Sequence, residues 1–322
     1  MWAALFLANV IHGVVALVWG AGVRRLAAPE SPAFGFAVLS LCLTMPLAAA
    51  ALHLIGFDPL GSAGGDIALL HVDGWVRLTG AAPPALPLVA TLLGGTVIVF
   101  GFQELGPTLA RLRSRRGVAR AADARLAAAV ERVGTRFRAA GALRRGAPLP
   151  SVARLETDAR IAALAGLLRP RILVSRGLLA VLDQDELDAV IAHELAHQAR
   201  GGNFAMLALW LVRSLQAHSP AALILFREIA RTQELTCDAL AARVTARPAA
   251  LASALLKTRP ARAPAPAGAP RMAVDEILRR ADLALTRERV TALLRAGAAA
   301  DPPGLAIVAS ALLLGGLLWA IA

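Results

Sequence analysis

The chain has 322 residues, of which 57% are hydrophobic and 17% are charged, so it is more apolar than an ordinary soluble domain. Its net charge of +12 does not indicate a nucleic-acid partner, because aromatic residues make up only 4% of the chain and the sequence contains no nucleic-acid-binding motif. Its two cysteines exclude a disulfide-rich scaffold. The composition instead predicts a partner in the lipid bilayer, whose anionic headgroups attract basic residues.

Four segments that contain no Asp, Glu, Lys or Arg predict transmembrane helices. Each is long enough to cross a hydrocarbon core of about 30 Å, which takes about 20 helical residues. The first segment lacks a basic stretch before it and a clear cleavage site after it, so we interpret it as an anchor and not as a removable signal peptide. Three of the predicted helices fall within residues 1–105 and the fourth is residues 302–322. The four segments are residues 1–23, 31–57, 78–103 and 302–322.

The distribution of arginine predicts the orientation of these helices. Residues 111–200 hold 17 arginines against nine acids, whereas the loop at 58–84 carries three aspartates and a single arginine. By the positive-inside rule the arginine-rich part faces the cytoplasm and the 58–84 loop faces outward. Arginine replaces lysine almost completely, which is typical of a GC-rich bacterial genome. We therefore expect a multi-pass protein of the bacterial cytoplasmic (inner) membrane.

Residues 106–258 predict a cytoplasmic α+β domain. Its first part, residues 107–145, has a helical pattern of apolar residues among arginines and is expected to form a helix or a helical hairpin at the membrane surface. Within residues 148–174 and at their end, two short runs are typical of strands, 151–156 and 171–175, and helix signals return at Ser175 and Asp183. We expect a small β-sheet that leads into a helix, within a protein that is otherwise mainly α.

The helix that begins near Asp183 carries the sequence His-Glu-Leu-Ala-His at residues 193–197. Positions i and i+4 of a helix lie on one face, so His193 and His197 can bind one metal ion. Glu194 lies about 100° around the axis, where it can act as general base toward a water molecule that the metal activates. The alternative is a surface helix with two histidines that are satisfied by other partners.

A second segment, Glu234 to Asp238, supplies further acids on one face of a predicted helix over residues 220–246. A zinc ion in a hydrolase takes three protein ligands and keeps one position open, and Glu234 is the expected third ligand. Asp238 is expected to accept the second ring N–H of a ligating histidine, although it could also be an ordinary solvated acid. Two histidines and a carboxylate suit Zn²⁺ best, and other divalent ions remain an alternative.

The apolar stretch at 203–226 is either a fifth transmembrane helix or a buried or interfacial helical hairpin. We favour the hairpin, because its uninterrupted halves are only about a dozen residues long. A single crossing would also leave His197 and Glu234 on opposite sides of the membrane. After this domain, residues 259–272 predict a Pro/Ala linker, and residues 273–300 predict a cytoplasmic helix.

The segments at 168–179 and 182–197 resemble the membrane metalloproteases of the BlaR1/MecR1 type, peptidase family M56. They are also similar to the Ste24- and HtpX-like proteases of family M48. The element at 233–238 and the layout of three helices before and one after the domain favour the BlaR1 type. This resemblance implies a gluzincin-like zinc protease in which His193, His197 and Glu234 bind zinc, Glu194 is the catalytic base and Asp238 supports the ligands. BlaR1-type receptors continue into a penicillin-binding sensor domain that this sequence lacks, so we do not expect antibiotic sensing by that route.

The sequence thus predicts a membrane-anchored zinc endopeptidase that cleaves a cytoplasmic regulator, itself or another membrane protein. One alternative is an M48-like protease for the quality control of membrane proteins, and another is an inactive scaffold. The protein or peptide substrate is expected to add as a strand to an exposed edge formed by the segment from Arg171 to Val174. The sequence does not indicate the substrate's identity or an oligomeric state. The expected substrate-binding residues are Arg171, Ile172, Leu173 and Val174.

Overall fold

The computed structural model of the chain describes residues 2–27, 31–54, 85–102, 120–121, 123–144, 146–258, 273–295 and 304–321. The expected 58–84 loop and the expected linker at 259–272 lie outside these residues. The chain divides into two units. Unit 1 comprises residues 1–113, 207–233 and 299–322, and unit 2 comprises residues 114–206 and 234–298.

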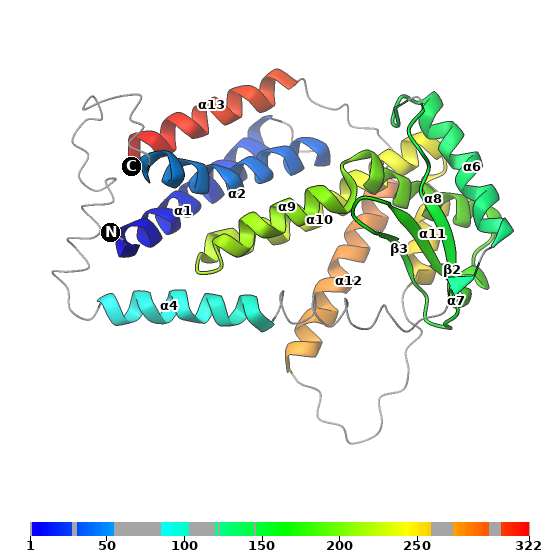
Figure 1. Cartoon of the computed structure of the whole chain (residues 1–322), viewed down its shortest axis with the longest axis horizontal. Coiled ribbons are helices and arrows are strands. Elements are labelled where there is room, and N and C mark those ends of the chain that lie inside the picture. Colours follow the sequence, from blue (N-terminus) through cyan, green and yellow to red (C-terminus); the bar gives the residue numbers. More distant parts are fainter. Residues whose placement is uncertain are drawn as a thin grey trace. The chain divides into compact units, whose positions relative to one another are not determined.

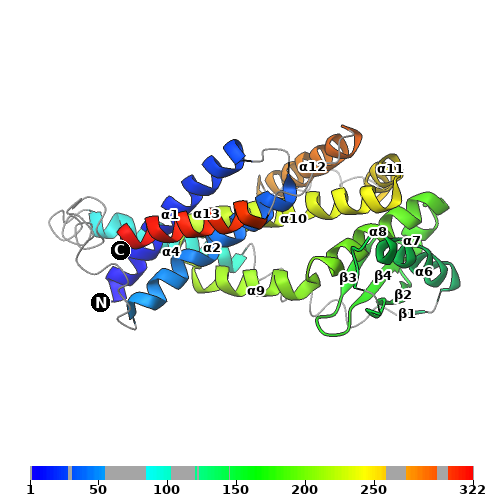
Figure 2. The same cartoon turned by 90° about the horizontal axis from the view of Figure 1, so that it is seen from above.

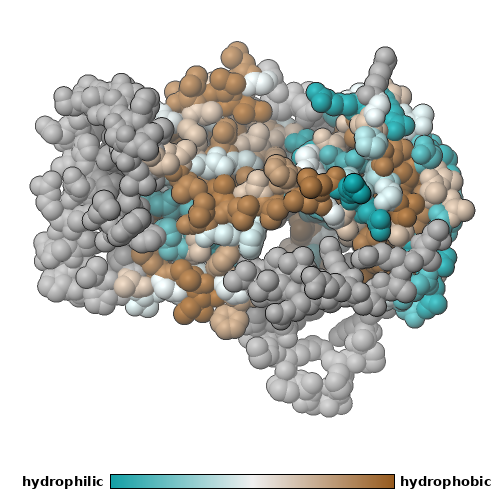
Figure 3. Space-filling model, in the orientation of Figure 1, coloured by the Kyte–Doolittle hydropathy of each residue, from teal (hydrophilic) through white to brown (hydrophobic). Residues whose placement is uncertain are grey.

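Unit 1 is built from apolar helices. Helices α1 (Trp2–Ala27), α2 (Pro32–Leu54) and α13 (Gly304–Ile321) pack side by side (Figure 1). A Cβ atom on Gly20 of α1 would lie 2.9 Å from the Sγ atom of Cys42, so a small residue is needed where α1 and α2 approach each other. Much of the surface drawn over α2 and α13 in Figure 3 is hydrophobic.

The described residues contain fewer helices that could span a membrane than the sequence predicts. Among the described residues, one helix is long and apolar enough to cross a membrane, Pro32–Ala49 within α2. Three further apolar helices are shorter than a full span: Ala90–Phe100, Gly202–Leu215 and Gly304–Leu318. The expected number of about four transmembrane helices is therefore not confirmed. Of the segment predicted at 78–103, the structure describes residues 85–102, and α4 spans Ala85–Phe100.

The apolar stretch predicted at 203–226 forms two helices, α9 (Gly202–Leu215) and α10 (Pro220–Thr245), that are joined by a short turn. At this turn the Gln216 side chain accepts a hydrogen bond from Asn9 of α1 and donates one to the backbone oxygen of Leu43 in α2. Gln216 and Asn9 are both buried. The break before Pro220 agrees with the predicted hairpin, and the polar turn is held by helices of unit 1.

Unit 2 contains a mixed four-stranded sheet with the order β1-β2-β4-β3. The central strands β2 (Ser151–Leu155) and β4 (Arg171–Ser175) are parallel, whereas β1 (Arg120–Ala121) and β3 (Ala162–Ala165) pair antiparallel at the two edges. The turn from β3 to β4 contains Gly166 at φ +88°, where a Cβ atom would lie 2.5 Å from the Arg169 backbone oxygen. The sheet and the helix signals that follow it are as the sequence predicts, but β3 was not predicted.

The expected exposed edge at residues 171–174 is wrong. Strand β4 pairs along its length with β2 on one side and with β3 on the other, so its backbone groups are used within the sheet. Ile172, Leu173 and Val174 are also buried. The edge strand beside β4 is β3.

One face of the sheet forms a core with the helices of unit 2 (Figure 2). Leu164, Ile172 and Val174 point into this core and meet apolar side chains of α6 (Ala124–Ala139) and α8 (Gln184–Ala199). Helix α6 therefore packs into the core of unit 2, and of the helical segment expected over residues 107–145 it covers Ala124–Ala139. Its expected place at the membrane surface stays a prediction. Helix α7 (Arg176–Leu179), α11 (Pro248–Thr258) and α12 (Ala273–Leu294) also contribute side chains to this core.

Helix α8 begins at Asp183 with a capping box that Asp183 and Glu186 form reciprocally. The buried Glu186 carboxylate also accepts hydrogen bonds from Ser253 at 2.7 Å and from Lys257 at 2.6 Å, both on α11. Burial raises the pKa of Glu186, but the hydrogen bonds from Lys257, Ser253 and the Asp183 backbone outweigh burial and lower the pKa below its usual value of 4.5. This network fixes the start of α8 against α11.

We expect Lys257→Met to lower the free energy of unfolding by about 1–2 kcal/mol at pH 7, because a hydrogen bond to a charged group is lost at a partly exposed lysine. Since folding lowers the pKa of Glu186, the stabilisation is present above pH 4.5 and is lost as the pH falls through the lowered pKa. The difference in thermal midpoint between the wild type and Lys257→Met should therefore shrink from pH 7 to pH 4. Lys257→Arg, which keeps the charge, is the control. A difference that stays constant with pH would contradict this account.

Candidate metal centre

The two histidines of helix α8 lie as the i, i+4 spacing predicts. The Nε2 atoms of His193 and His197 are 3.1 Å apart, and both rings are mostly buried. Leu187, Ile191 and Leu195 of the same helix are fully buried in the core of unit 2, which fixes the rotation of α8. The helix thus presents two ring nitrogens to one point.

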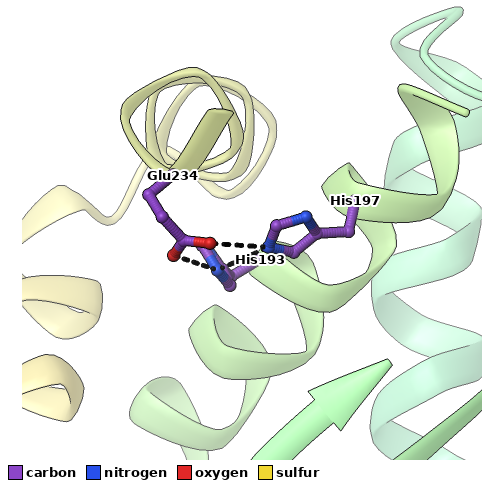
Figure 4. Close-up of side chains that lie close together, drawn as sticks. All are labelled: His193, His197 and Glu234. Carbon is purple, nitrogen blue, oxygen red and sulfur yellow. Dashed lines mark hydrogen bonds and ion pairs between the residues drawn. The ribbon is translucent and has the colours of Figure 1, made fainter. Parts of the chain in front are cut away.

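Glu234 of α10 completes a group of three ligand atoms (Figure 4). Its Oε2 atom is 3.5 Å from Nε2 of His193, and its Oε1 atom is 3.5 Å from Nε2 of His197. In a tetrahedral zinc site with bonds of about 2.0–2.1 Å, neighbouring ligand atoms are about 3.3 Å apart. The distances between the donor atoms and their chemistry therefore fit a zinc ion, which these three side chains could hold with a fourth position left open.

Glu194 lies beside this group and is buried. Its carboxylate accepts a hydrogen bond from the backbone N–H of Leu164 in the edge strand β3. Burial raises the pKa of Glu194, and the charge of Glu234 adds to this effect, although His193 opposes it. A carboxylate with a raised pKa is a stronger base, as a general base for hydrolysis requires.

Asp238 lies one helical turn after Glu234 and contacts His193 from the other side of the ring. Its Oδ1 atom is 2.8 Å from Nδ1 of His193, so the carboxylate can accept the proton on Nδ1 and leave Nε2 free as a ligand atom. Asp238 is 3% exposed at its side chain. The position predicted from the i+4 spacing is the one that the structure shows.

The carboxylates make this place favourable for a cation. Burial lowers the pKa of His193, but its hydrogen bonds to the carboxylates of Asp238 and Glu234 outweigh burial and raise it to about 10. Burial and the charge of His193 lower the pKa of His197 to about 4, so His197 is neutral at pH 7. Burial raises the pKa of Glu234, but contacts with His193 and Arg289 lower it well below its usual range. The site thus attracts positive charge, as a divalent metal ion requires.

One residue at this site was missed by sequence reasoning. Arg289 of α12 contacts both Asp238 and Glu234, with distances of 2.6 Å and 2.8 Å at the shortest. It lies within the segment that was predicted only as a cytoplasmic helix. The chain is rich in arginine, so this side chain has no local feature that marks it. The predicted substrate residues Arg171 to Val174 lie in the central strand β4. The strand that contacts Glu194 is β3, through Leu164.

Comparisons with known proteins find a peptidase profile over the segment that holds these residues. Residues 122–262 match the sequence profile described as Peptidase family M48. The chain is similar to a Protease HtpX homolog of Pyrococcus furiosus, with 29% identity over 151 residues, 36% of this chain and 52% of the relative. A Protease HtpX homolog of Thermococcus kodakarensis is 31% identical over 155 residues, with the same shares.

The chain spans about half the length of these curated relatives. The peptidases of family M48 are zinc metalloproteases, which agrees with the ligand set of His193, His197 and Glu234. The closer likeness to the BlaR1 type, family M56, is not confirmed. The comparisons support an M48-type peptidase for residues 122–262, the segment that holds His193, Glu194, His197 and Glu234.

Proposed function

We propose that this protein is a membrane-anchored zinc metalloendopeptidase of the M48 type. The observation that carries the proposal is the convergence of three ligand atoms from α8 and α10 beside the buried carboxylate of Glu194. The similarity to HtpX homologues favours the quality control of membrane proteins over the cleavage of a specific regulator. An inactive scaffold is disfavoured, because all the side chains that the chemistry needs are present and lie together.

Zinc, when bound by His193, His197 and Glu234, supplies a Lewis acid that polarises the scissile carbonyl and lowers the pKa of water. Glu194 accepts the proton of the attacking water on its carboxylate. It then donates this proton to the nitrogen of the leaving amine, so one residue acts as base and then as acid. The N–H of Leu164 holds the Glu194 carboxylate in place during both steps. We assign the roles of ligands to the first three residues and of catalytic base to Glu194.

We propose that an extended substrate segment pairs with β3 and not with β4. The hydrogen bond from the Ser175 N–H to the Ile161 oxygen sets the register of the antiparallel pair. In this register the backbone groups of Ala162 and Leu164 point away from β4. Those of Leu164 contact Glu194 and Asn203, whereas Ala162 presents its outward N–H and C=O two residues before Leu164 on the same edge.

We expect Ala162→Pro to lower kcat/KM for casein by about tenfold, because it removes one outward N–H, which is worth about 1–1.5 kcal/mol. Proline is tolerated on an edge strand when its missing N–H faces outward, so the zinc content should stay unchanged. Ala162→Val keeps the N–H and is the matched control. Equal activity of Ala162→Pro and Ala162→Val would contradict pairing of the substrate at this position.

We also propose that several helices of unit 1 anchor the protein in the bacterial cytoplasmic membrane and that the site faces the cytoplasm. Large hydrophobic side chains on the surfaces of α4 and α13 support this anchoring, among them Ile98, Leu305 and Leu312. The excess of arginine in unit 2 supports the orientation. Cysteine labelling of an exposed unit 2 position such as Glu131 should require permeabilised inner membranes. Labelling in intact cells with a membrane-impermeant reagent would contradict this topology.

The direct test of the proposed function is an assay of the purified full chain in detergent. We expect about one zinc ion per chain and cleavage of casein that stops with a chelator and returns when zinc is added. A chain that holds no zinc, or whose cleavage of casein is unaffected by the chelator, would overturn the proposal.

A further inference from the structure

Arg289 of helix α12 contacts the two carboxylates of α10 that flank the His193 ring. We propose that Arg289 is a positioning residue of the metal centre, whose guanidinium fixes the Asp238 carboxylate so that this carboxylate orients His193 for metal binding. This inference rests on the proposed function. It assigns part of the metal centre to helix α12, which begins at Ala273, beyond the end of the M48 match at residue 262.

The contact between Arg289 and Asp238 is bidentate. Nε of Arg289 is 2.6 Å from Oδ2 of Asp238, and Nη2 is 2.8 Å from Oδ1. Two parallel hydrogen bonds between a planar guanidinium and a carboxylate fix both the place and the rotation of the carboxylate. The same Oδ1 atom accepts the bond from Nδ1 of His193 at 2.8 Å. The orientation of Asp238 therefore determines the orientation of the ring.

The third nitrogen of the guanidinium contacts the metal-ligand carboxylate. Nη1 of Arg289 is 2.8 Å from Oε2 of Glu234. Glu234 and Asp238 lie on one face of α10, where two negative charges repel each other. A single cation that contacts both carboxylates offsets this repulsion. One arginine thus holds both acids of the helix in the arrangement that the site uses.

The Asp238 carboxylate needs the Arg289 cation because both side chains are buried. The side chain of Asp238 is 3% exposed and that of Arg289 is 13% exposed, so neither charge is well solvated. A buried carboxylate that loses its cationic partner is left uncompensated and moves toward water, which weakens its hydrogen bond with His193. Lysine cannot replace the bidentate contact, because its ammonium is a point charge without the planar fork.

Helix α12 is held in unit 2 by its own packing. Leu293 is buried in the core that also contains α8 residues such as Leu187 and Ile191, and Val290 packs against this core. Arg289 is adjacent to Val290 and projects from a helix that the core already fixes. The packing of α12 in this core therefore places the Arg289 side chain against Asp238 and Glu234.

Two other roles predict different results. If the ion pair only stabilises the fold, its loss lowers the thermal midpoint without changing the zinc affinity of the folded protein. If Arg289 competes with the metal for Glu234, its loss tightens zinc binding. A positioning role predicts weaker zinc binding, as outer partners of ligating histidines commonly contribute 10–100-fold.

The experiment compares Arg289→Met and Arg289→Lys with the wild type in the full-length chain. Arg287→Met is the matched control, since Arg287 is an exposed arginine on the same helix. Zinc affinity is measured by competition with a chromophoric chelator, the fold by circular dichroism, and the coordination by the visible spectrum of the cobalt-substituted protein. We expect Arg289→Met to weaken zinc binding by about 10–100-fold and to change the cobalt spectrum. Arg289→Lys should recover part of the affinity, and Arg287→Met should match the wild type.

The outcomes separate this inference from the proposed function. If the wild type binds zinc and the folded Arg289→Met variant binds zinc with equal or higher affinity, the inference is overturned and the proposed function is not. A wild type that binds no zinc would overturn the proposed function and the inference with it. If Arg289→Met does not fold, the test uses Arg289→Lys. A zinc affinity equal to that of the wild type, together with an unchanged cobalt spectrum, in Arg289→Lys would then overturn the positioning role.

Discussion

Glu194→Gln should remove almost all of the proteolytic activity while the protein keeps its zinc. Glutamine has nearly the same shape and can accept the hydrogen bond from the Leu164 N–H, but it cannot take a proton from water. General base catalysis contributes about 10²–10⁴-fold, which corresponds to about 3–5 kcal/mol of the activation free energy. We therefore expect kcat for casein to fall by about 10³-fold. His193, His197 and Glu234 are unchanged in this variant, so about one zinc ion per chain should remain.

The control for this prediction is Glu131→Gln, which makes the same substitution at an exposed position of α6. It should leave both kcat and zinc content unchanged. Activity in Glu194→Gln close to that of the wild type would remove Glu194 from the mechanism. If cells with Glu194→Gln also retained every phenotype of the wild type, the inactive scaffold would become the better account of the protein.

The sequence predicts those parts of the site that depend on spacing within one helix. His193 and His197 on α8, and Glu234 and Asp238 on α10, lie on common faces because the period of a helix places i and i+4 together. The start of α8 at Asp183 was also predictable, because a capping acid and Glu186 three residues later form a recognisable pattern. These features are local, so one sequence contains enough information to place them.

The parts that the sequence does not predict depend on contacts between distant segments. Strand β3 reads Ala-Ala-Leu-Ala, a composition that favours helix, and it becomes a strand through its pairing with β4. Missing β3 led directly to the wrong expectation that Arg171 to Val174 form an exposed edge. Arg289 lies 51 residues from Asp238 in the chain, and its role follows from the packing of α12 in the core. Neither contact leaves a periodic pattern in the sequence.

Glu234→Ala should remove both zinc and activity, which distinguishes it from Glu194→Gln. It leaves two protein ligands, and we expect zinc affinity to fall by more than about 100-fold, beyond the loss that an outer partner of a ligand causes. The stability of the protein should change accordingly. Zinc at 100 times its dissociation constant stabilises the folded state by about 2.7 kcal/mol, so zinc should raise the thermal midpoint of the wild type and of Glu194→Gln. The midpoint of Glu234→Ala should not respond to the same zinc concentration.

Glu228→Ala is the matched control, since it removes a glutamate from the same helix at a position that pairs with Arg24 and Arg231. This variant should bind zinc as the wild type does and show the same rise in midpoint. A chelator should lower the midpoint of the wild type and of Glu228→Ala, and it should leave that of Glu234→Ala unchanged. If Glu234→Ala kept its zinc and its cleavage of casein, the third ligand would have to come from another side chain. The convergence of α8 and α10 would then no longer account for the chemistry.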